Sequence, residues 1–403
     1  MIKGRDFVVF SLHQWEDFNI SRSTSLEISR NNRVLFVNVP LYRSNWLRGR
    51  NNPEFQKRFD VLSNKAPEIE KISESIWLMN PRIVLESINW INSPCLFDYF
   101  NKINDKRLAK RIKHAMNELG FHDVIVLNDT SMIIGYYLKE LLNPDLYIYL
   151  LRDAVTLVPY HAKHGTRLEP KLIAKSDLMV TNSPFFDNFK AKHNPESYYV
   201  GQGCNPDLYS DPDGKLPLPE DTVSLKRPII GYVGMLTSLR LDIQLLVEMA
   251  EKRPDWTLLL VGPEDDDFKK SRLHQMQNVV FLGKKPIKEV PAYMKSFDIA
   301  INPQIVNKIT DLNYPLKTDE YLAMGKPAVA TKTTFMEFYF KDSTYLATGS
   351  DEYITCIEKA LKEDSAELAK ERKAVAQSHS WEHFVNRIFE PAIKIMKERS
   401  SKQ

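Results

Sequence analysis

The sequence predicts an α/β protein of two domains, each with a parallel sheet covered by helices on both faces. Short, continuously apolar segments alternate with segments of helical periodicity, which is typical of a parallel sheet buried between helices. A proline-rich stretch at residues 201–228 interrupts this alternation, which then restarts. The length of 403 residues also exceeds one ordinary core, since domains run to roughly 150 residues.

The first half alternates strands and helices from its start. Each expected strand is short, apolar and bounded by polar residues, as a strand without a solvent face should be. The expected strands are residues 6–12, 33–39, 123–128, 146–151 and 177–181, and a helix is expected at residues 21–30. The linker that follows is marked by Pro206, Pro212, Pro217, Pro219 and Pro228.

The second half repeats the pattern and ends in helices. Its expected strands are residues 228–233, 256–261, 279–282, 298–302 and 327–331, and its expected helices are residues 241–252, 290–296, 316–324, 352–363, 365–377 and 381–398. Pro391 predicts a kink in the last helix. In such folds a ligand binds at the carboxyl ends of the strands, so we expect it in a cleft between the two domains.

The composition excludes several classes of protein. Hydrophobic residues make up 43% and charged residues 27%, which is an ordinary soluble composition rather than a disordered one. No apolar run approaches the ~18 residues of a membrane helix, and the N-terminus does not resemble a signal peptide. The net charge of +3 is too small for a dedicated nucleic-acid binder. Three scattered cysteines predict a reducing, cytoplasmic location without disulfides or a cysteine-based zinc site.

Two segments carry an excess of basic residues. The first surrounds Trp46 and the second follows a helical pattern at residues 102–113. Basic residues near an anionic membrane contribute roughly 1 kcal/mol each, so these segments predict a peripheral membrane contact, and a solvated helix face is the alternative. They comprise Arg43, Arg48, Arg50, Lys57 and Arg58, and then Lys102, Lys106, Arg107, Lys110, Arg111 and Lys113.

A glycine motif, Gly231-Tyr-Val-Gly234, ends the strand that opens the second half. Glycines there let backbone amides approach a phosphate, and the start of the next helix adds its positive end. The alternative is a tight turn that merely needs a positive φ.

A second motif spans residues 313–327. Asn313 is a candidate N-cap and Pro315 suits the first turn of a helix. Lys317 then lies where the helix dipole disfavours a cation, and a bound diphosphate would remove that conflict. Glu320, one turn further, could accept hydrogen bonds from a ribose diol. The alternative for Glu320 is an ordinary exposed acid of the helix.

These motifs occur in an ordered series that resembles a known family. Gly-Tyr-Val-Gly, Pro-Asp-Trp-Thr-Leu-Leu-Leu-Val-Gly-Pro, Asn-Val-Val-Phe-Leu-Gly and Pro-Leu-Lys-Thr-Asp-Glu-Tyr-Leu-Ala-Met-Gly-Lys-Pro follow one another over about residues 228–340. The series resembles the donor domain of GT-B glycosyltransferases, nearest to bacterial family 4-like enzymes of the teichuronic-acid and exopolysaccharide type. Residues 381–397 resemble their C-terminal helix. The resemblance implies an acceptor-side Rossmann-like domain at residues 1–205, a donor domain at 206–380, and a helix at 381–403 that crosses back to the first domain.

The resemblance also implies roles for single residues. Glu320 would hold the donor ribose. Lys317 and Arg240, with the amides of Gly234 and Met235, would meet the diphosphate, and the two cations would thereby take part in catalysis. The backbone around Gly283 and Lys284 would edge the nucleobase. Two departures from the family pattern stand out: Met235 and Leu236 replace an Arg-Lys pair, and Leu312 replaces the first glutamate of a paired motif. The further donor-side candidates are Gly231, Gly234, Met235, Gly283, Lys284, Asp311 and Leu316.

Candidates on the acceptor side follow two strands of the first half. They are His13, Trp15 and Asp17 after the first strand, and Arg152 and Asp153 after the strand at residues 146–151. Trp15 could stack on a sugar, and Asp153 could act as a base or orient a hydroxyl. The alternatives are a tryptophan at the edge of the core and an aspartate in a cap or ion pair.

His161 and His164 lie three residues apart, but no third ligand is near them in sequence, so we expect no metal. The resemblance implies transfer of a sugar from a nucleoside-diphosphate sugar to a saccharide or lipid-linked acceptor, with retention and without a cofactor, in bacterial surface-polysaccharide synthesis at the inner face of the membrane. A sugar-nucleotide epimerase on the same fold and a non-catalytic nucleotide-sugar-binding protein are the alternatives.

Overall fold

The computed structural model describes residues 1–16, 20–49, 52–152, 155–184, 192–211, 213–308 and 310–401. The chain folds into two compact units, which we call the first unit (Met1–Gly203 with Trp381–Gln403) and the second unit (Cys204–Ser380). The first boundary therefore lies two residues before the expected one. The terminal helix belongs to the first unit, although the residues that separate it from Gly203 form the second unit.

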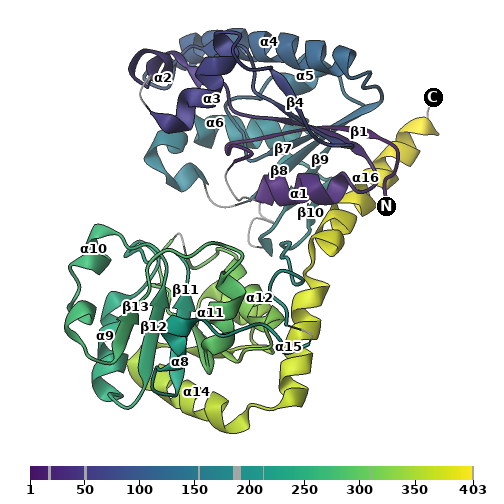
Figure 1. Cartoon of the computed structure of the whole chain (residues 1–403). Coiled ribbons are helices and arrows are strands. Elements are labelled where there is room, and N and C mark those ends of the chain that lie inside the picture. Colours follow the sequence, from purple (N-terminus) through teal and green to yellow (C-terminus); the bar gives the residue numbers. More distant parts are fainter. Residues whose placement is uncertain are drawn as a thin grey trace. The chain divides into compact units, whose positions relative to one another are not determined.

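The first unit is built on an eight-stranded sheet in the order β10-β9-β8-β7-β1-β2-β5-β4 (Figure 1). All neighbouring strands are parallel except the edge pair β4 and β5. The strands are β1 (Asp6–Ser11), β2 (Arg33–Val37), β4 (Ile69–Ser73), β5 (Ile76–Met79), β7 (Val124–Asp129), β8 (Leu146–Leu151), β9 (Leu178–Thr181) and β10 (Ser197–Tyr199), with β3 (Leu41–Tyr42) and β6 (Val84–Leu85) forming a separate pair.

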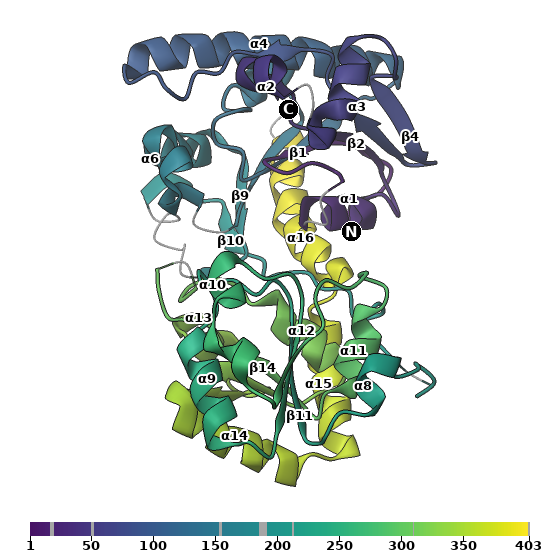
Figure 2. The ribbon, with the colours of Figure 1, turned by 60° about the vertical axis from the view of Figure 1, so that its left-hand side comes forward.

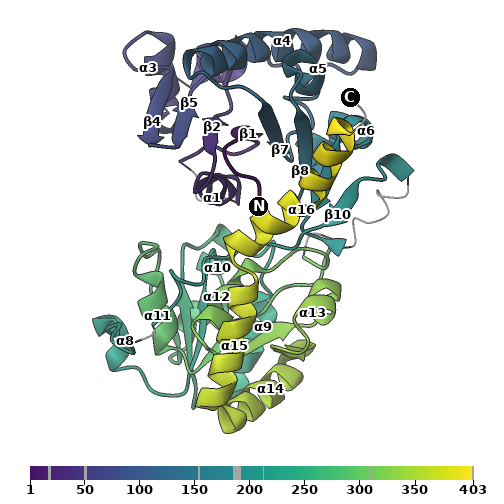
Figure 3. The same ribbon diagram turned by 90° about the vertical axis from the view of Figure 1, so that its right-hand side faces the viewer.

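Helices cover both faces of this sheet, because its central strands are apolar on both sides. In β1, Phe7 and Val9 pack toward α1 (Ile20–Ile28) and α16 (Trp381–Ser400), while Val8 and Phe10 face the opposite core. That opposite core is closed by α4 (Pro94–Glu118), α5 (Leu138–Leu142) and α6 (Pro159–Lys175). Figures 1 and 3 show α4 on the side of the sheet away from α1 and α16. Two short helices, α2 (Arg43–Arg48) and α3 (Pro53–Leu62), follow β3.

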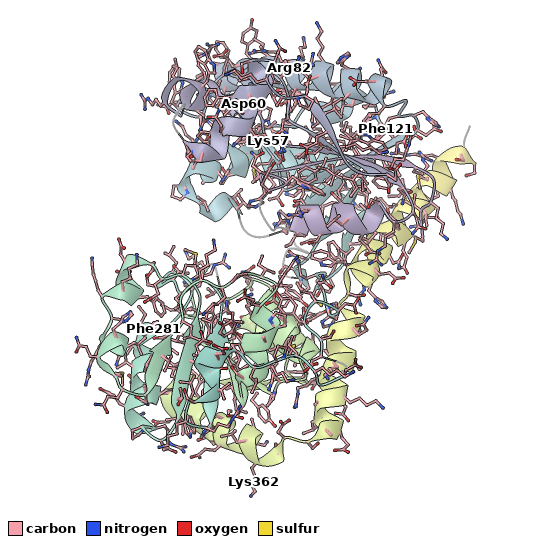
Figure 4. The ribbon with its side chains drawn as sticks, in the orientation of Figure 1. Lys57, Asp60, Arg82, Phe121, Phe281 and Lys362 are labelled. Carbon is pink, nitrogen blue, oxygen red and sulfur yellow. The ribbon has the colours of Figure 1, made fainter. Side chains whose placement is uncertain are left out.

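Three of the side chains labelled in Figure 4 lie on, or contact, outer strands of the two sheets. Lys57 on α3 binds Glu70 of β4 at 2.8 Å, and Phe121 packs edge-on against Trp77 of β5. In the second unit, Phe281 on the edge strand β13 (Val279–Phe281) stacks on His274 at 4.0 Å.

The second unit has a six-stranded, wholly parallel sheet in the order β13-β12-β11-β14-β15-β16. Figure 2 labels two of its central strands, β11 and β14. Its other strands are β11 (Ile229–Val233), β12 (Thr257–Val261), β14 (Ile299–Asn302), β15 (Ala328–Thr331) and β16 (Tyr345–Ala347). Large apolar residues such as Ile230 and Leu260 pack under α9 (Ile243–Lys252) and α14 (Gly349–Glu363). The opposite face carries α11 (Val290–Ser296) and α12 (Leu316–Ala323), and α15 (Ala366–Ser378) packs along α12. Three short helices, α8 (Glu220–Val223), α10 (Asp266–Lys269) and α13 (Thr334–Tyr339), complete this unit.

The fold is thus the predicted α/β class, with parallel sheets in both units. Within the described ranges, none of the helices has the length and apolar character needed to cross a membrane. The expected strands are present, and the sequence analysis did not predict β3, β4, β5, β6, β10 or β16. The strand β4 has exposed, polar residues and therefore lacks the continuous apolar run that marked the predicted strands. Its register with β5 is also irregular.

Candidate functional site

The carboxyl edge of the second sheet brings three glycines together. Gly234, Gly262 and Gly283 follow the neighbouring strands β11, β12 and β13, and all three have positive φ. A β carbon on Gly262 would lie 1.7 Å from the carbonyl oxygen of Gly234, so the two loops touch through their backbones. Only glycine fits such an approach. The edge therefore offers a backbone-lined surface next to the start of α12.

Lys317 lies beside this glycine surface. A β carbon on Gly234 would lie 3.4 Å from the Cε atom of Lys317 and 2.7 Å from the hydroxyl of Tyr232. The amide of Gly234, however, donates to the carbonyl of Val261 at 2.9 Å and extends the sheet. This amide is therefore not available to a phosphate, and that part of the prediction is wrong; the space next to Gly234 borders Lys317. The exposed Met235 follows it, and among the described residues its amide has no hydrogen-bond acceptor.

Gly231 has a different role from the predicted one. It is buried in the middle of β11 and is paired with Leu259 on one side and Ala300 on the other. A β carbon there would lie 2.1 Å from the ring of Phe297. Gly231 is therefore a packing position that admits this ring against the sheet, and its prediction as a donor-binding residue is wrong.

Lys317 and Glu320 form an ion pair across the first turn of α12. The Nζ atom of Lys317 lies 2.6 Å from Oε2 of Glu320. Glu320 is only 6% exposed, whereas the Lys317 side chain is 32% exposed. The helix begins at Leu316 after Pro315 and has no side-chain cap, so the prediction of Asn313 as N-cap is wrong. Glu320 partly offsets the unfavourable position of Lys317 at the positive end of the helix.

Two tyrosines complete the surroundings of Glu320. The hydroxyl of Tyr209, which lies in the proline-rich linker, hydrogen-bonds to Glu320, and burial followed by the Glu320 charge raises the Tyr209 pKa. Burial also raises the pKa of Tyr232, an effect that the charge of Arg240 opposes and that of Glu320 reinforces. The charges of Arg240 and Glu320 therefore shift the pKa of Tyr232 in opposite directions. Arg240 is exposed, and it forms no ion pair within the described part of the chain.

The remaining donor-side candidates divide into two kinds. Asp311 accepts hydrogen bonds from the amide and hydroxyl of Thr334, at 2.8 and 3.0 Å, and so binds the start of α13. This contact accounts for the position of Asp311. Its carboxylate is engaged by Thr334 and is therefore not free to bind a sugar. Leu316 is half-buried at the start of α12, and Gly283 is followed by the exposed Lys284 at the end of β13.

A buried network next to this site was not predicted. The carboxylate of Asp319, which is wholly buried, accepts from Tyr314 at 2.5 Å and lies 2.7 Å from Nδ1 of His379. Burial raises the pKa of Asp319, and His379 opposes that shift. His379 follows α15, so the network ties the end of that helix to α12. The sequence offered one signal, a polar Lys-Thr-Asp-Glu run inside an otherwise apolar helix.

In the first unit, the structure corrects the prediction for Trp15. Its ring is 7% exposed and packs edge-on against Phe36 at 5.1 Å, while its amide donates to Asn38 at 2.7 Å. Trp15 is therefore part of the core and cannot stack on a sugar. Asp17 and Asp153 lie outside the described residues. Arg152 is buried and binds Asp129 at 2.5 Å, which is a structural ion pair at the ends of β8 and β7.

His13 lies at a cavity of about 560 Å³ within the first unit. His161 lines the same cavity, and burial, followed by the proximity of His13, lowers its pKa. His164 instead stacks on Phe97 at 3.6 Å. Within the described ranges, no cluster of three histidine, cysteine or acidic side chains is arranged to hold a metal ion.

The two basic segments differ in the structure. Near Trp46, Arg43 binds Glu86 at 2.5 Å and Lys57 binds Glu70. On α4, Arg111 is likewise paired with Glu68. The exposed lysines of α4 form no ion pairs among the described residues, so the free positive charge is concentrated on this helix; they are Lys102, Lys106, Lys110 and Lys113.

Comparison with solved structures defines the class of fold. The sucrose-phosphate synthase from Thermosynechococcus elongatus has a TM-score of 0.68 at 14% identity, with 98% of this chain and 100% of that chain covered. The Anabaena protein HepE, solved in complex with UDP, has a TM-score of 0.67 at 15% identity, with 97% and 100% covered. The chain has the GT-B fold, as predicted.

The sequence comparisons find similarity within the second unit. Residues 227–363 match the family described as Glycosyl transferases group 1. The Bacillus subtilis protein TuaH, named as a teichuronic acid biosynthesis glycosyltransferase, is 33% identical over 159 residues. That alignment covers 38% of this chain and 40% of TuaH, so the match spans less than half of either protein.

Proposed function

We propose that the protein is a glycosyltransferase that moves a sugar from a nucleoside-diphosphate sugar to a saccharide or lipid-linked acceptor. The observation that carries this proposal is the pairing of Lys317 with the buried Glu320 beside Gly234, inside the segment that matches group 1 glycosyl transferases. A cation and a carboxylate one turn apart match the two ends of a nucleoside diphosphate. The diphosphate needs positive charge, and the ribose diol needs a hydrogen-bond acceptor.

The donor would enter by exchanging partners with this ion pair. The ammonium of Lys317 would leave Oε2 of Glu320 for a diphosphate oxygen, and the freed carboxylate would accept hydrogen bonds from the ribose. The Tyr209 hydroxyl would keep Glu320 oriented during this exchange. Because Glu320 is buried and held by a second group, its position is fixed before the donor arrives, which lowers the entropic cost of binding.

Arg240 would supply the second positive charge. Its exposed side chain acts on Tyr232 and has no carboxylate partner among the described residues, so a phosphate would not have to displace one. Two cations at the diphosphate would stabilise the negative charge that develops as the sugar leaves. We therefore propose catalysis without a metal cofactor, with retention at the anomeric carbon, and expect activity to survive chelation of divalent cations.

The finer parts of the proposal rest on the relatives. HepE was solved with UDP, so uridine donors are the first to test. The name of TuaH supports a role in bacterial surface-polysaccharide synthesis. The exposed lysines of α4 support contact with an anionic membrane from the cytoplasmic side, where a lipid-linked acceptor would be found.

One observation favours a second candidate, a nucleotide-sugar-binding protein without transferase activity. Leu312 stands where the family carries its first glutamate, and the neighbouring Asp311 is engaged by Thr334. Such a protein would bind the donor but would not release nucleoside diphosphate when acceptors are added. Release that depends on an acceptor would support the transferase and exclude both this candidate and an epimerase.

The proposal is tested by donor binding to a Glu320→Gln variant. Calorimetry with UDP, GDP, ADP and TDP sugars would first identify the base. The variant should then bind that donor about tenfold or more weakly, since each charge-assisted hydrogen bond is worth ~1.5–3 kcal/mol. Glu337→Gln is the matched control, because Glu337 is an exposed acid of α13 in the same unit. Wild-type affinity in Glu320→Gln would remove this residue from the donor site.

A further inference from the structure

The cavity of the first unit has a mixed lining that none of the sequence motifs explains. Its volume of about 560 Å³ is that of a small-molecule site, which typically ranges over ~300–1,000 Å³. One part of the wall is apolar and comes from the segments after β6, β7 and β8 and from α4. It comprises Ile88, Phe97, Ile133, Ile134 and Val155. A pocket for a free, hydroxyl-rich saccharide would not need such a wall.

Large apolar side chains continue from this wall to the protein surface. Trp90, Val158 and Tyr160 line the cavity and are nevertheless 75%, 48% and 57% exposed. Leu96 and Tyr99 are also exposed and lie on α4 beside Phe97, which lines the cavity. Single exposed apolar residues are ordinary, but a patch that is continuous with an apolar cavity marks a binding surface.

The opposite part of the lining is polar. His13 and His161 both line the cavity, and the lowered pKa of His161 favours its neutral ring, which can accept a hydrogen bond. Asn89 donates through Nδ2 to the carbonyl of Tyr160 at 3.0 Å, whereas its buried Oδ1 has no partner among the described residues. A hydroxyl donor on a ligand would satisfy that oxygen.

The charge on α4 indicates where such a ligand comes from. Residues three and four apart share a face of a helix. Leu96 and Tyr99 are therefore followed along the exposed side of α4 by Lys102, Lys106 and Lys110. Exposed apolar and aromatic residues beside unpaired lysines are typical of helices that lie on an anionic bilayer. Figure 1 shows α4 running along the outside of its unit.

We infer that this cavity binds the apolar chain of an amphiphilic acceptor, a lipid-linked saccharide or lipid phosphate, which enters from an anionic membrane past Trp90, Val158 and Tyr160. The inference rests on the proposed transferase function and names its acceptor class. The chain fills the apolar wall, and the polar end, with His13, His161 and Asn89, receives the hydroxyl-bearing part. Lysines of α4 hold the surface against anionic headgroups.

The test measures binding of decyl phosphate, detected by displacement of a fluorescent decyl phosphate from the full chain. Val158→Asp is the main variant. Val158 is the N-cap residue of α6, where aspartate suits a helix start, so the change places a charge in the rim without weakening the helix. Trp90→Ser is the second variant, because an exposed side chain can be replaced without unfolding. Val223→Asp, at an exposed valine of the second unit, is the matched control.

Binding should fall at least about tenfold in Val158→Asp and Trp90→Ser and stay unchanged in Val223→Asp. The same two variants should sediment less with phosphatidylglycerol vesicles, and wild-type sedimentation should fall as salt rises. Affinity for UDP should be unchanged in all three variants, so failure of the donor site would be seen separately. Absence of decyl phosphate binding, equal binding by Val158→Asp, or displacement of the probe by a soluble oligosaccharide alone would overturn the inference.

Discussion

Replacing Lys317 by alanine should destabilise the protein even without a donor. From the helix dipole alone, removal of a cation from the first turn of α12 would stabilise the helix by ~0.3–1 kcal/mol. The structure reverses this sign, because Lys317 binds Glu320 at 2.6 Å and Glu320 is almost wholly buried. The variant leaves that carboxylate with the Tyr209 hydroxyl but without its cation.

The magnitude follows from the geometry. A hydrogen bond between charged groups contributes ~1.5–3 kcal/mol. Lys317 is about a third exposed, so water would replace part of the lost interaction, and relief of the dipole conflict offsets a further part. We expect a net loss of about 1–2 kcal/mol of local stability. The additional Glu320→Gln change should recover much of it, because a neutral amide needs no counter-charge.

Hydrogen exchange of peptides from α12 measures this local free energy directly. Lys332→Ala is the matched control, since Lys332 binds Glu337 at 2.8 Å in a pair that is about half exposed. Such a pair contributes ~0–1 kcal/mol, so the control should change exchange little. If α12 is as well protected from exchange in Lys317→Ala as in the wild type, the ion pair contributes no net stability. The argument from the helix dipole alone would then be the better one.

Two further predictions concern other charged groups. Arg240→Ala should lower turnover by about tenfold or more and leave thermal stability unchanged, because the side chain is exposed and forms no ion pair among the described residues. Steady-state kinetics with the identified donor measures the effect, and unchanged kcat and KM would contradict a role for Arg240. Burial raises the pKa of Glu169 to about 7, and its contribution to stability is therefore present below its ordinary pKa near 4.5 and lost as pH rises through about 7. The urea midpoint should fall between about pH 4.5 and about pH 7, and Glu169→Gln should flatten that fall, which an equally steep profile in the variant would disprove.

The fold was accessible from the sequence because the central strands carry their own signal. Residues such as Val8 and Ile230 lie in continuously apolar segments, and a strand buried on both faces requires that composition. Edge elements lack this signal. The strand β4 has exposed residues and pairs with β5 through a register shift, so its existence depends on a neighbour rather than on its own pattern. The same holds for Trp15, whose burial depends on Phe36 from the next strand.

The geometry of the proposed donor site was predicted in part, for a comparable reason. Lys317 and Glu320 are one turn apart in a single helix, so helical geometry alone brings them together. Contacts between distant segments were missed. Tyr209 reaches Glu320 from a stretch that its prolines mark only as a linker, and His379 reaches Asp319 from the end of another helix, 60 residues further along the chain. No local pattern encodes such a contact.

The two glycines of one motif show that a motif alone does not decide which of its residues can contact a ligand. Gly231 and Gly234 stand three residues apart, and the motif assigned both of them to the donor. Gly231 lies inside the strand, where both of its edges are paired and Phe297 fills the space of a side chain. Gly234 lies just beyond the strand with a positive φ, and there the space next to it belongs to Lys317. The end of β11 separates a packing glycine from a site glycine, so the position of a residue relative to the end of its strand, and not its place in the motif, decides which of the two can meet a ligand.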